Sequence, residues 1–349
     1  MATLSHLAMM SPFVFSGRMI HLTSIRQLLP QPATYFPIRN GRYDTNPNLF
    51  RLGTDFGNGI TDKRLFQLDS EFDTFRANKM ACRAERYSKY VCVDDFSPAV
   101  EQAVISLIRQ LLTQAYPVWF ESIPRSDGTL EFHCGLTGDR LLFDQQDGLV
   151  QREDAVYTGP WDALCCQIQE DVAVVRRSSN RGDWIAALHL CAPSHWAAEE
   201  KIGRNWSATH EPVPGMEKLR TAAAAIVTTI IDQPPTVRFT WGIEFDTRLN
   251  RHPQPPPDVA VQEWNARVPH IGASESLYLR TERQVMWGLP EHDAALFTIR
   301  IHHTPLSALR TNREHLAALR SALLAMSPSS QVYKSVEACL PAVITLLDQ

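Results

Sequence analysis

The side chains best able to bind a metal lie between His189 and Pro214. His210 comes just before Pro212 and Pro214, which restrict the backbone and could hold an imidazole in one orientation. Imidazole is the commonest metal-binding side chain, so His210 is the first candidate for a metal ligand. His195 lies in the same segment and is the rival candidate. His189 lies within an apolar run, which is typical of a hydrogen-bonded core residue.

Cysteine and the remaining histidines narrow the choice of metal site. Cys191 could supply a thiolate, but a single cysteine at the end of an apolar run is more often a small buried hydrophobe. The seven cysteines include no CxxC pair, which argues against disulfides, a structural zinc site or an iron–sulfur cluster bound by this chain. His302 and His303 are adjacent on a predicted strand, so they point to opposite faces and cannot both bind one metal.

Alternating apolar residues indicate the strands that would position these side chains. In residues 236–243, Val237 and Trp241 point one way while Arg238 and Thr240 point the other. Further strands are predicted at residues 65–69, 130–136, 141–150, 171–177, 184–191, 277–286 and 295–301. Short strands that follow one another are typical of an antiparallel sheet with helices packed against it, so the predicted fold class is α+β.

Helices are predicted before, between and after these strands. One begins at Ser97-Pro98, where a capping residue is followed by proline, and ends at Pro117. The run 216–231 is rich in alanine and apolar along nearly its whole length, which predicts a buried helix. The remaining helices are predicted at residues 72–89, 306–326 and 332–347.

Composition limits the class of protein. The formal net charge of -4 gives no electrostatic reason to expect nucleic acid as a partner. No apolar run approaches the roughly 20 residues of a membrane-spanning helix, so we expect no membrane partner. We therefore expect a soluble, cytoplasmic protein.

The N-terminal segment has a different composition. Residues 1–43 contain no Asp or Glu but four arginines, which is typical of an organelle transit peptide. A start codon upstream of the true one is the other interpretation, and we favour it. We assign residues 1–32 to an N-terminal extension and residues 33–349 to a single domain, with organelle import left open.

Several separated motifs resemble, in their order, the alpha subunits of heme-dependent oxidative N-demethylases. Residues 191–214 run from a strand through Pro, Trp and a Lys-x-Gly turn to the histidine before Pro-Val-Pro. Residues 238–241 read Arg-Phe-Thr-Trp where the family usually reads Arg-Phe-Asn-Trp, so Thr240 departs from the pattern. Residues 280–284 match the family's Arg-x-Glu-Arg-Gln, and the resemblance spans about residues 33–310.

The resemblance implies a fold and a cofactor. The fold would be a heme-binding variant of the PAS architecture, a curved antiparallel sheet flanked by helices, with additional N- and C-terminal helices. The cofactor would be heme b, with His210 as the axial ligand of the iron. The two heme propionates need cations, for which Lys201, Arg204 and Arg238 are the candidates.

The resemblance also implies an activity, the oxidative N-demethylation of a small alkylamine such as dimethylamine. O2 and two electrons would oxidise an N-methyl group, and the carbinolamine product would break down to formaldehyde and a shorter amine. A protonated amine needs a carboxylate or an aromatic face, and Glu170, Glu244 and Trp241 are the candidate substrate-binding residues. We assign no catalytic residue.

The electrons are expected from a separate reductase. This chain has no glycine-rich dinucleotide motif and no cysteine cluster, so NADPH, flavin and iron–sulfur centres are expected on a partner. The alternative is a non-catalytic PAS-like heme or ligand sensor, although the C-terminal helices lack the sustained heptads of a signalling coiled coil. A relative that has lost its heme is the third possibility.

Overall fold

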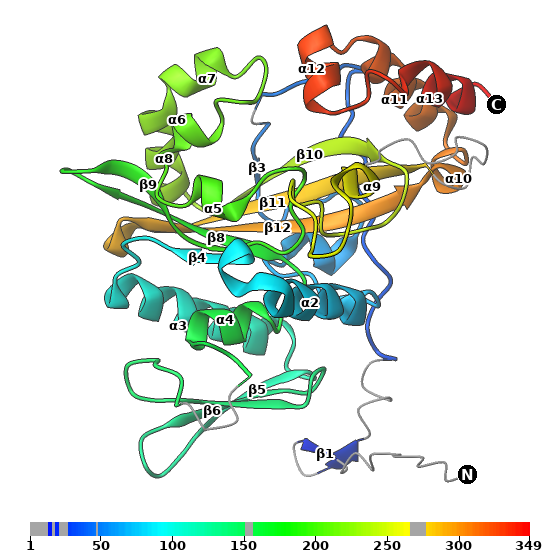
Figure 1. Cartoon of the computed structure of the whole chain (residues 1–349). Coiled ribbons are helices and arrows are strands. Elements are labelled where there is room, and N and C mark those ends of the chain that lie inside the picture. Colours follow the sequence, from blue (N-terminus) through cyan, green and yellow to red (C-terminus); the bar gives the residue numbers. More distant parts are fainter. Residues whose placement is uncertain (1–12, 16–17, 21–26, 47, 151–155, 266–276) are drawn as a thin grey trace.

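The structure of this chain is a computed structural model that describes residues 13–15, 18–20, 27–46, 48–150, 156–265 and 277–349 (Figure 1). Much of the predicted N-terminal extension, including residues 1–12, lies outside the described residues. Within that extension, β1 (Phe13–Phe15) pairs with β2 (Arg18–Ile20) as a two-stranded hairpin that joins neither of the other sheets.

A seven-stranded antiparallel sheet forms the centre of the molecule, with the strand order β3-β10-β11-β12-β8-β9-β4. Its strands are β3 (Phe50–Arg51), β4 (Val91–Val93), β8 (Asp171–Ser178), β9 (Gly182–His189), β10 (Thr236–Glu244), β11 (Tyr278–Leu289) and β12 (Ala294–Pro305). The predicted α+β class is confirmed.

The two faces of this sheet carry different side chains, as the alternation in β10 predicts. Val237 and Trp241 are buried on one face, which we call the α3 face. Arg238, Thr240 and Gly242 point to the opposite face, which we call the α8 face. The register with β11 places Gln284, Glu282 and Arg280 beside these three residues in the same order.

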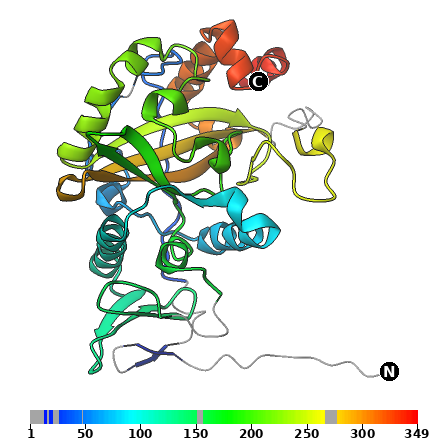
Figure 2. The same cartoon turned by 60° about the vertical axis from the view of Figure 1, so that its left-hand side comes forward.

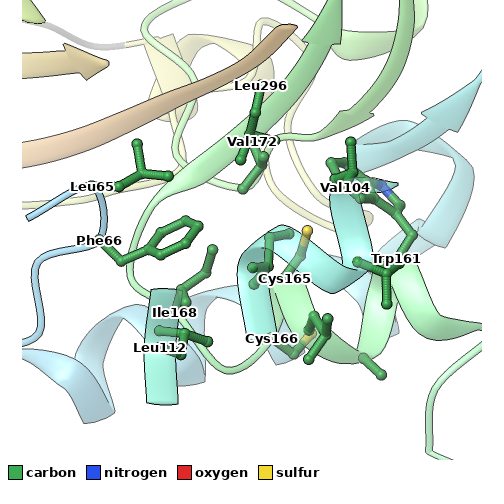
Figure 3. Close-up of a cluster of buried hydrophobic side chains, with 14 of the residues drawn as sticks. Leu65, Phe66, Val104, Leu112, Trp161, Cys165, Cys166, Ile168, Val172 and Leu296 are labelled. Carbon is green, nitrogen blue, oxygen red and sulfur yellow. The ribbon is translucent and has the colours of Figure 1, made fainter. Parts of the chain in front are cut away.

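The α3 face is covered by α2 (Phe72–Tyr90), α3 (Pro98–Ala115) and α4 (Pro160–Cys165) (Figure 1). Figure 3 shows Val104 and Leu112 of α3 in the same apolar cluster as Val172 of β8 and Leu296 of β12. The fully buried side chains of α3 recur at helical spacing, as predicted. Each contributes on the order of 1.5–3 kcal/mol to the stability of the fold.

A separate three-stranded sheet lies beyond α3 and α4, on the side away from the large sheet (Figures 1 and 2). Its strands are β5 (Phe120–Pro124), β6 (Leu130–Cys134) and β7 (Asp139–Phe143). The predicted strand at 141–150 ends early because the Asp144 carboxylate accepts the N–H groups of Gln146 and Gly148, each at 2.8 Å, and so stabilises a turn.

Short helices lie on the other side of the large sheet and beside β10, where the C-terminal ones also pack against Trp241, Ile243 and Leu279 of the α3 face (Figures 1 and 2). They are α5 (Ala198–Lys201), α6 (Trp206–Thr209), α7 (Glu217–Thr221), α8 (Ala223–Asp232), α10 (Leu306–Leu309), α11 (Arg313–Leu324), α12 (Pro328–Tyr333) and α13 (Leu340–Leu347). The remaining helices are α9 (Val261–Asn265) and the 3-10 turns η1 (Gly59–Lys63) and η3 (Pro290–His292). Among the described helices, none has the length and apolar character needed to cross a bilayer.

The predicted strand at residues 65–69 is wrong, because this segment is extended but pairs with no strand. Its N–H groups are satisfied by buried side chains instead. The N–H of Gln67 donates to Glu170 at 2.7 Å, and the N–H of Leu68 donates to the Tyr116 hydroxyl at 3.0 Å. Apolar periodicity cannot distinguish these partners from a strand ladder.

The predicted long helices are also wrong in detail. The run 216–231 forms two helices that meet at Ala222, and only Val227 and Ile231 of α8 are buried. Alanine favours helix whether or not it is buried, so the composition indicated the helix but not its environment. The predicted helix 306–326 is divided because the Asn312 side chain accepts two N–H groups and starts α11 anew. The predicted helix 332–347 is likewise replaced by α12 and α13.

Candidate functional site

On the α8 face, β9 and β12 carry apolar side chains, whereas β10 and β11 carry mainly polar ones. Leu188, Ile299 and Ile301, from β9 and β12, belong to one buried apolar cluster. The next two strands present polar side chains on this face, namely Arg238, Thr240, Glu244, Arg280, Glu282 and Gln284. The change from apolar to polar marks a part of the face that is not ordinary protein core.

The sheet is uncovered at Gly242, in the middle of this polar area. A Cβ atom added to Gly242 would have no atom of the described residues within 4 Å. A Cβ atom added to Gly288, on the same face, would instead lie 2.0 Å from the carbonyl oxygen of Ile231, because α8 packs directly on that strand. The helices therefore leave open space over β10 while covering the neighbouring end of the hairpin.

Charged groups beside this space are surrounded by protein but keep some solvent-exposed area. Burial is the largest cause of the lowered pKa of Arg238, of Lys334 and of His303, whose pKa falls to about 3. All three side chains are nevertheless only half-buried by area. We call the open space over Gly242, on the sheet face that carries Arg238 and His303, the recess.

His210 is held rigidly at one side of the polar area, directly after α6. The Asn205 side chain accepts the Ala208 N–H at 2.8 Å and caps this single helical turn. The His210 ring stacks on Trp206 with the ring centroids 4.1 Å apart, and its Nδ1 lies 2.8 Å from the Trp206 carbonyl oxygen. A carbonyl only accepts hydrogen bonds, so Nδ1 carries the proton and Nε2 keeps its lone pair.

The electrostatic surroundings of His210 favour its neutral form. Burial is the largest cause that lowers its pKa to about 4, and the positive charges of Arg238 and Lys201 lower it further. At pH 7 the imidazole is therefore neutral, which is the form that binds a metal. The structure thus provides at His210 a fixed ring with one nitrogen available for a ligand bond.

The three predicted propionate partners are placed differently. Arg238 is half-buried, and in the part of the chain that the structure describes it forms no ion pair, while its buried Nε has no acceptor. Lys201 is buried and donates from Nζ to the Thr209 carbonyl oxygen at 3.0 Å. Arg204 is exposed, with a charge close enough to lower the pKa of Lys201.

The three predicted substrate-binding residues are not brought together. Glu170 is fully buried next to the α3 face, where it accepts the Gln67 N–H. Trp241 points to the α3 face and contacts Tyr43 edge-on, with ring centroids 5.6 Å apart. Only Glu244 shares the α8 face with Arg238.

Glu244 is ionised and held by two partners. The Nε atom of Arg251 lies 3.1 Å from its carboxylate, and Nε2 of His195 lies 3.7 Å away. Burial alone would raise the pKa of Glu244, but His195 and Arg251 hold it at about 2. His195, the rival metal ligand, therefore faces a carboxylate, and its backbone is left-handed with φ of 61°.

Two more charged residues lie near the recess: Glu282, for which the sequence suggested an ion pair or a place at the pocket, and Lys334, which sequence reasoning missed. Glu282 accepts from the Thr240 hydroxyl at 3.1 Å and forms an ion pair with Arg280. Burial raises its pKa, but Arg280 and Lys334 outweigh burial and lower the pKa overall. The alternation in β11 places Glu282 on this face, whereas no local pattern links Lys334 to β11.

A second group of potential ligands lies in the core beneath the sheet. Asp162, Cys166 and His189 place one ligand atom each within 4.8 Å of one another. Arg83 already forms an ion pair with Asp162 at 2.6 Å, so the negative charge of this carboxylate is balanced by the protein and not left for a metal ion. Burial raises the pKa of the nearby Cys191 well above 9.0, which disfavours the thiolate that a Cys191 ligand would need.

Comparison with known families finds the family that the sequence motifs resemble. The family model for haem-dependent oxidative N-demethylase, alpha subunit-like, proteins matches residues 58–344, which is most of the chain. The matched region includes His210, α12, the first part of α13 and every strand of the large sheet except β3. This chain therefore belongs to the haem-dependent oxidative N-demethylase, alpha subunit-like family.

Proposed function

We propose that this chain binds heme b in the recess over Gly242 and oxidises an N-methyl group of a small alkylamine of the dimethylamine type. The observation that carries this proposal is the state of His210, a neutral imidazole fixed through Nδ1 with Nε2 available for the iron. A hydrogen bond from the second ring nitrogen to a carbonyl is the usual support of a metal-binding histidine.

The residues around the recess fit a heme. Its iron needs one strong ligand, and its carboxylates need cations such as Arg238. When bound, the heme supplies the redox chemistry with O2, while the protein fixes the cofactor and orients the amine.

Glu244 is the residue that we propose for attracting the amine. A dialkylamine is protonated at neutral pH, and Glu244 is ionised on the same sheet face as the recess. Arg251 balances part of this negative charge, so the attraction for a single ammonium group is moderate. Glu170 and Trp241 lie away from this face and have no part in the proposal.

The overall reaction needs two electrons from outside this chain. Dimethylamine, O2, two electrons and two protons give methylamine, formaldehyde and water. We propose that a separate reductase supplies the electrons from NADPH through flavin and iron–sulfur centres. Hydrogen peroxide contains O2 with the two electrons and two protons already added, so it can replace the partner in a test.

Formaldehyde release is the test of this function. The purified chain loaded with heme should release formaldehyde from dimethylamine when hydrogen peroxide is added, at a rate that exceeds free heme. His210→Ala should lose this rate, because the ring that holds the iron is removed. A chain that binds heme through His210 but releases no formaldehyde, with peroxide or with a reductase, would instead be a sensor.

A further inference from the structure

Lys334 brings a positive charge from the C-terminal helices to the α8 face of the sheet. It directly follows α12, and its N–H donates to the Ser330 carbonyl oxygen at 2.9 Å. Its Nζ lies 5.9 Å from the ring centre of Tyr43 and 5.7 Å from that of Tyr333. In the described chain Lys334 forms no ion pair, although Glu282 is near enough to act on its charge.

The charges around the recess leave two cations without a partner. Arg280 forms an ion pair with Glu282, and Arg251 forms one with Glu244. Arg238 and Lys334 remain without an ion pair among the described residues, and no acceptor there reaches the buried Nε of Arg238. Two half-buried like charges without anionic partners are unfavourable, so an anionic group that contacts both would stabilise them.

The open space over Gly242 lies on the same sheet face as Arg238. Gly242 lies on the same face of β10 as Arg238, with Thr240 between them, and no atom of the described residues lies within 4 Å of a Cβ atom added there. A protonated amine would be repelled from this part of the recess. A molecule with two carboxylates would neutralise both cations, through the fork of the arginine and the point charge of the lysine.

We infer that Arg238 and Lys334 each hold one of the two propionates of the heme, so that the cofactor ties the C-terminal helices to β10. This inference rests on the function proposed above. Lys334 takes the place of Lys201 and Arg204 as the second propionate partner, because Lys201 already donates to Thr209 and Arg204 is exposed.

The experiment compares two forms of the cofactor. Heme-free protein is titrated with ferric protoporphyrin IX and, separately, with its dimethyl ester, which has the same ring and iron but no carboxylates. Binding is followed by the Soret absorption band. The proteins are the wild type, Lys334→Gln, Arg238→Gln, the double variant and the control Lys218→Gln, whose lysine is exposed on α7.

We expect the wild type to bind the free acid at least tenfold more tightly than the ester. Each single variant should lose about tenfold in affinity for the free acid, the usual effect of one charge-assisted hydrogen bond, while the ester is unaffected. The double variant should bind acid and ester alike. Without heme, Lys334→Gln should melt no lower than the wild type, because it removes an unpaired cation.

Two results would overturn the inference. One is a wild type that binds acid and ester equally well, which leaves the proposed function intact. The other is a Lys334→Gln variant that loses heme-free stability and weakens both ligands equally, as expected of a lysine that only supports the fold. A wild type that binds neither compound would overturn the proposed function itself.

Discussion

Replacing Gly242 with leucine tests whether the space over β10 is used. The backbone of Gly242 is not in the left-handed region, and no atom of the described residues lies within 4 Å of an added Cβ atom, so a side chain can begin here without backbone strain or a clash at Cβ. Glycine within a strand costs conformational entropy, so Gly242→Leu should leave the free energy of unfolding unchanged or raise it by up to about 1 kcal/mol. The same side chain should exclude the cofactor and lower heme affinity at least tenfold.

The assay pairs two measurements on one protein. Urea unfolding of the heme-free variant gives its stability, and titration with ferric protoporphyrin IX gives its affinity. Gly242→Ala is the matched control, since it adds only the Cβ atom and should keep most of the affinity. A stable Gly242→Leu protein with wild-type heme affinity would refute the placement of the cofactor over this strand.

The remaining predictions concern the elements around the site. Gly288→Ala should destabilise the protein by about 1–3 kcal/mol in urea unfolding, because the new Cβ atom would lie 2.0 Å from the Ile231 carbonyl oxygen. Asp162→Asn should cost about 3–5 kcal/mol in the same assay, since it leaves the buried Arg83 partner unpaired, whereas the exposed Asp348→Asn should have no measurable effect. The pKa of His210 is about 4 in the folded protein, so between pH 6.5 and about 4 the unfolded state binds a proton at His210 that the folded state does not bind. The free energy of unfolding of the heme-free protein should therefore fall as the pH is lowered through this range, and His210→Gln should reduce the fall.

The parts of the fold with a local period could be predicted from the sequence. Alternation in β10 placed Arg238 and Trp241 on opposite faces, and the structure confirms this arrangement. The prolines after His210 predicted a fixed ring, and its hydrogen bond to Trp206 agrees with that prediction. These features depend on neighbours within a few positions of the residue, which the sequence contains directly.

The parts that depend on tertiary contacts could not be predicted. Glu170 was a candidate for binding an amine, yet it accepts an N–H group 103 positions away in the sequence. Lys334 reaches β11 only because two helix breaks turn the C-terminal segment back over the sheet. The space at Gly242 depends on where α8 stops, which no motif specifies.

The central claim is that Nε2 of His210 holds the heme iron, and the absorption spectrum of the heme-loaded protein tests it most directly. His210→Ala should lose the Soret band of the wild type, and added imidazole should restore it by occupying the vacated position. His195→Ala and Cys191→Ala should keep the band. A wild-type spectrum in His210→Ala, together with loss of the band in either other variant, would contradict the account.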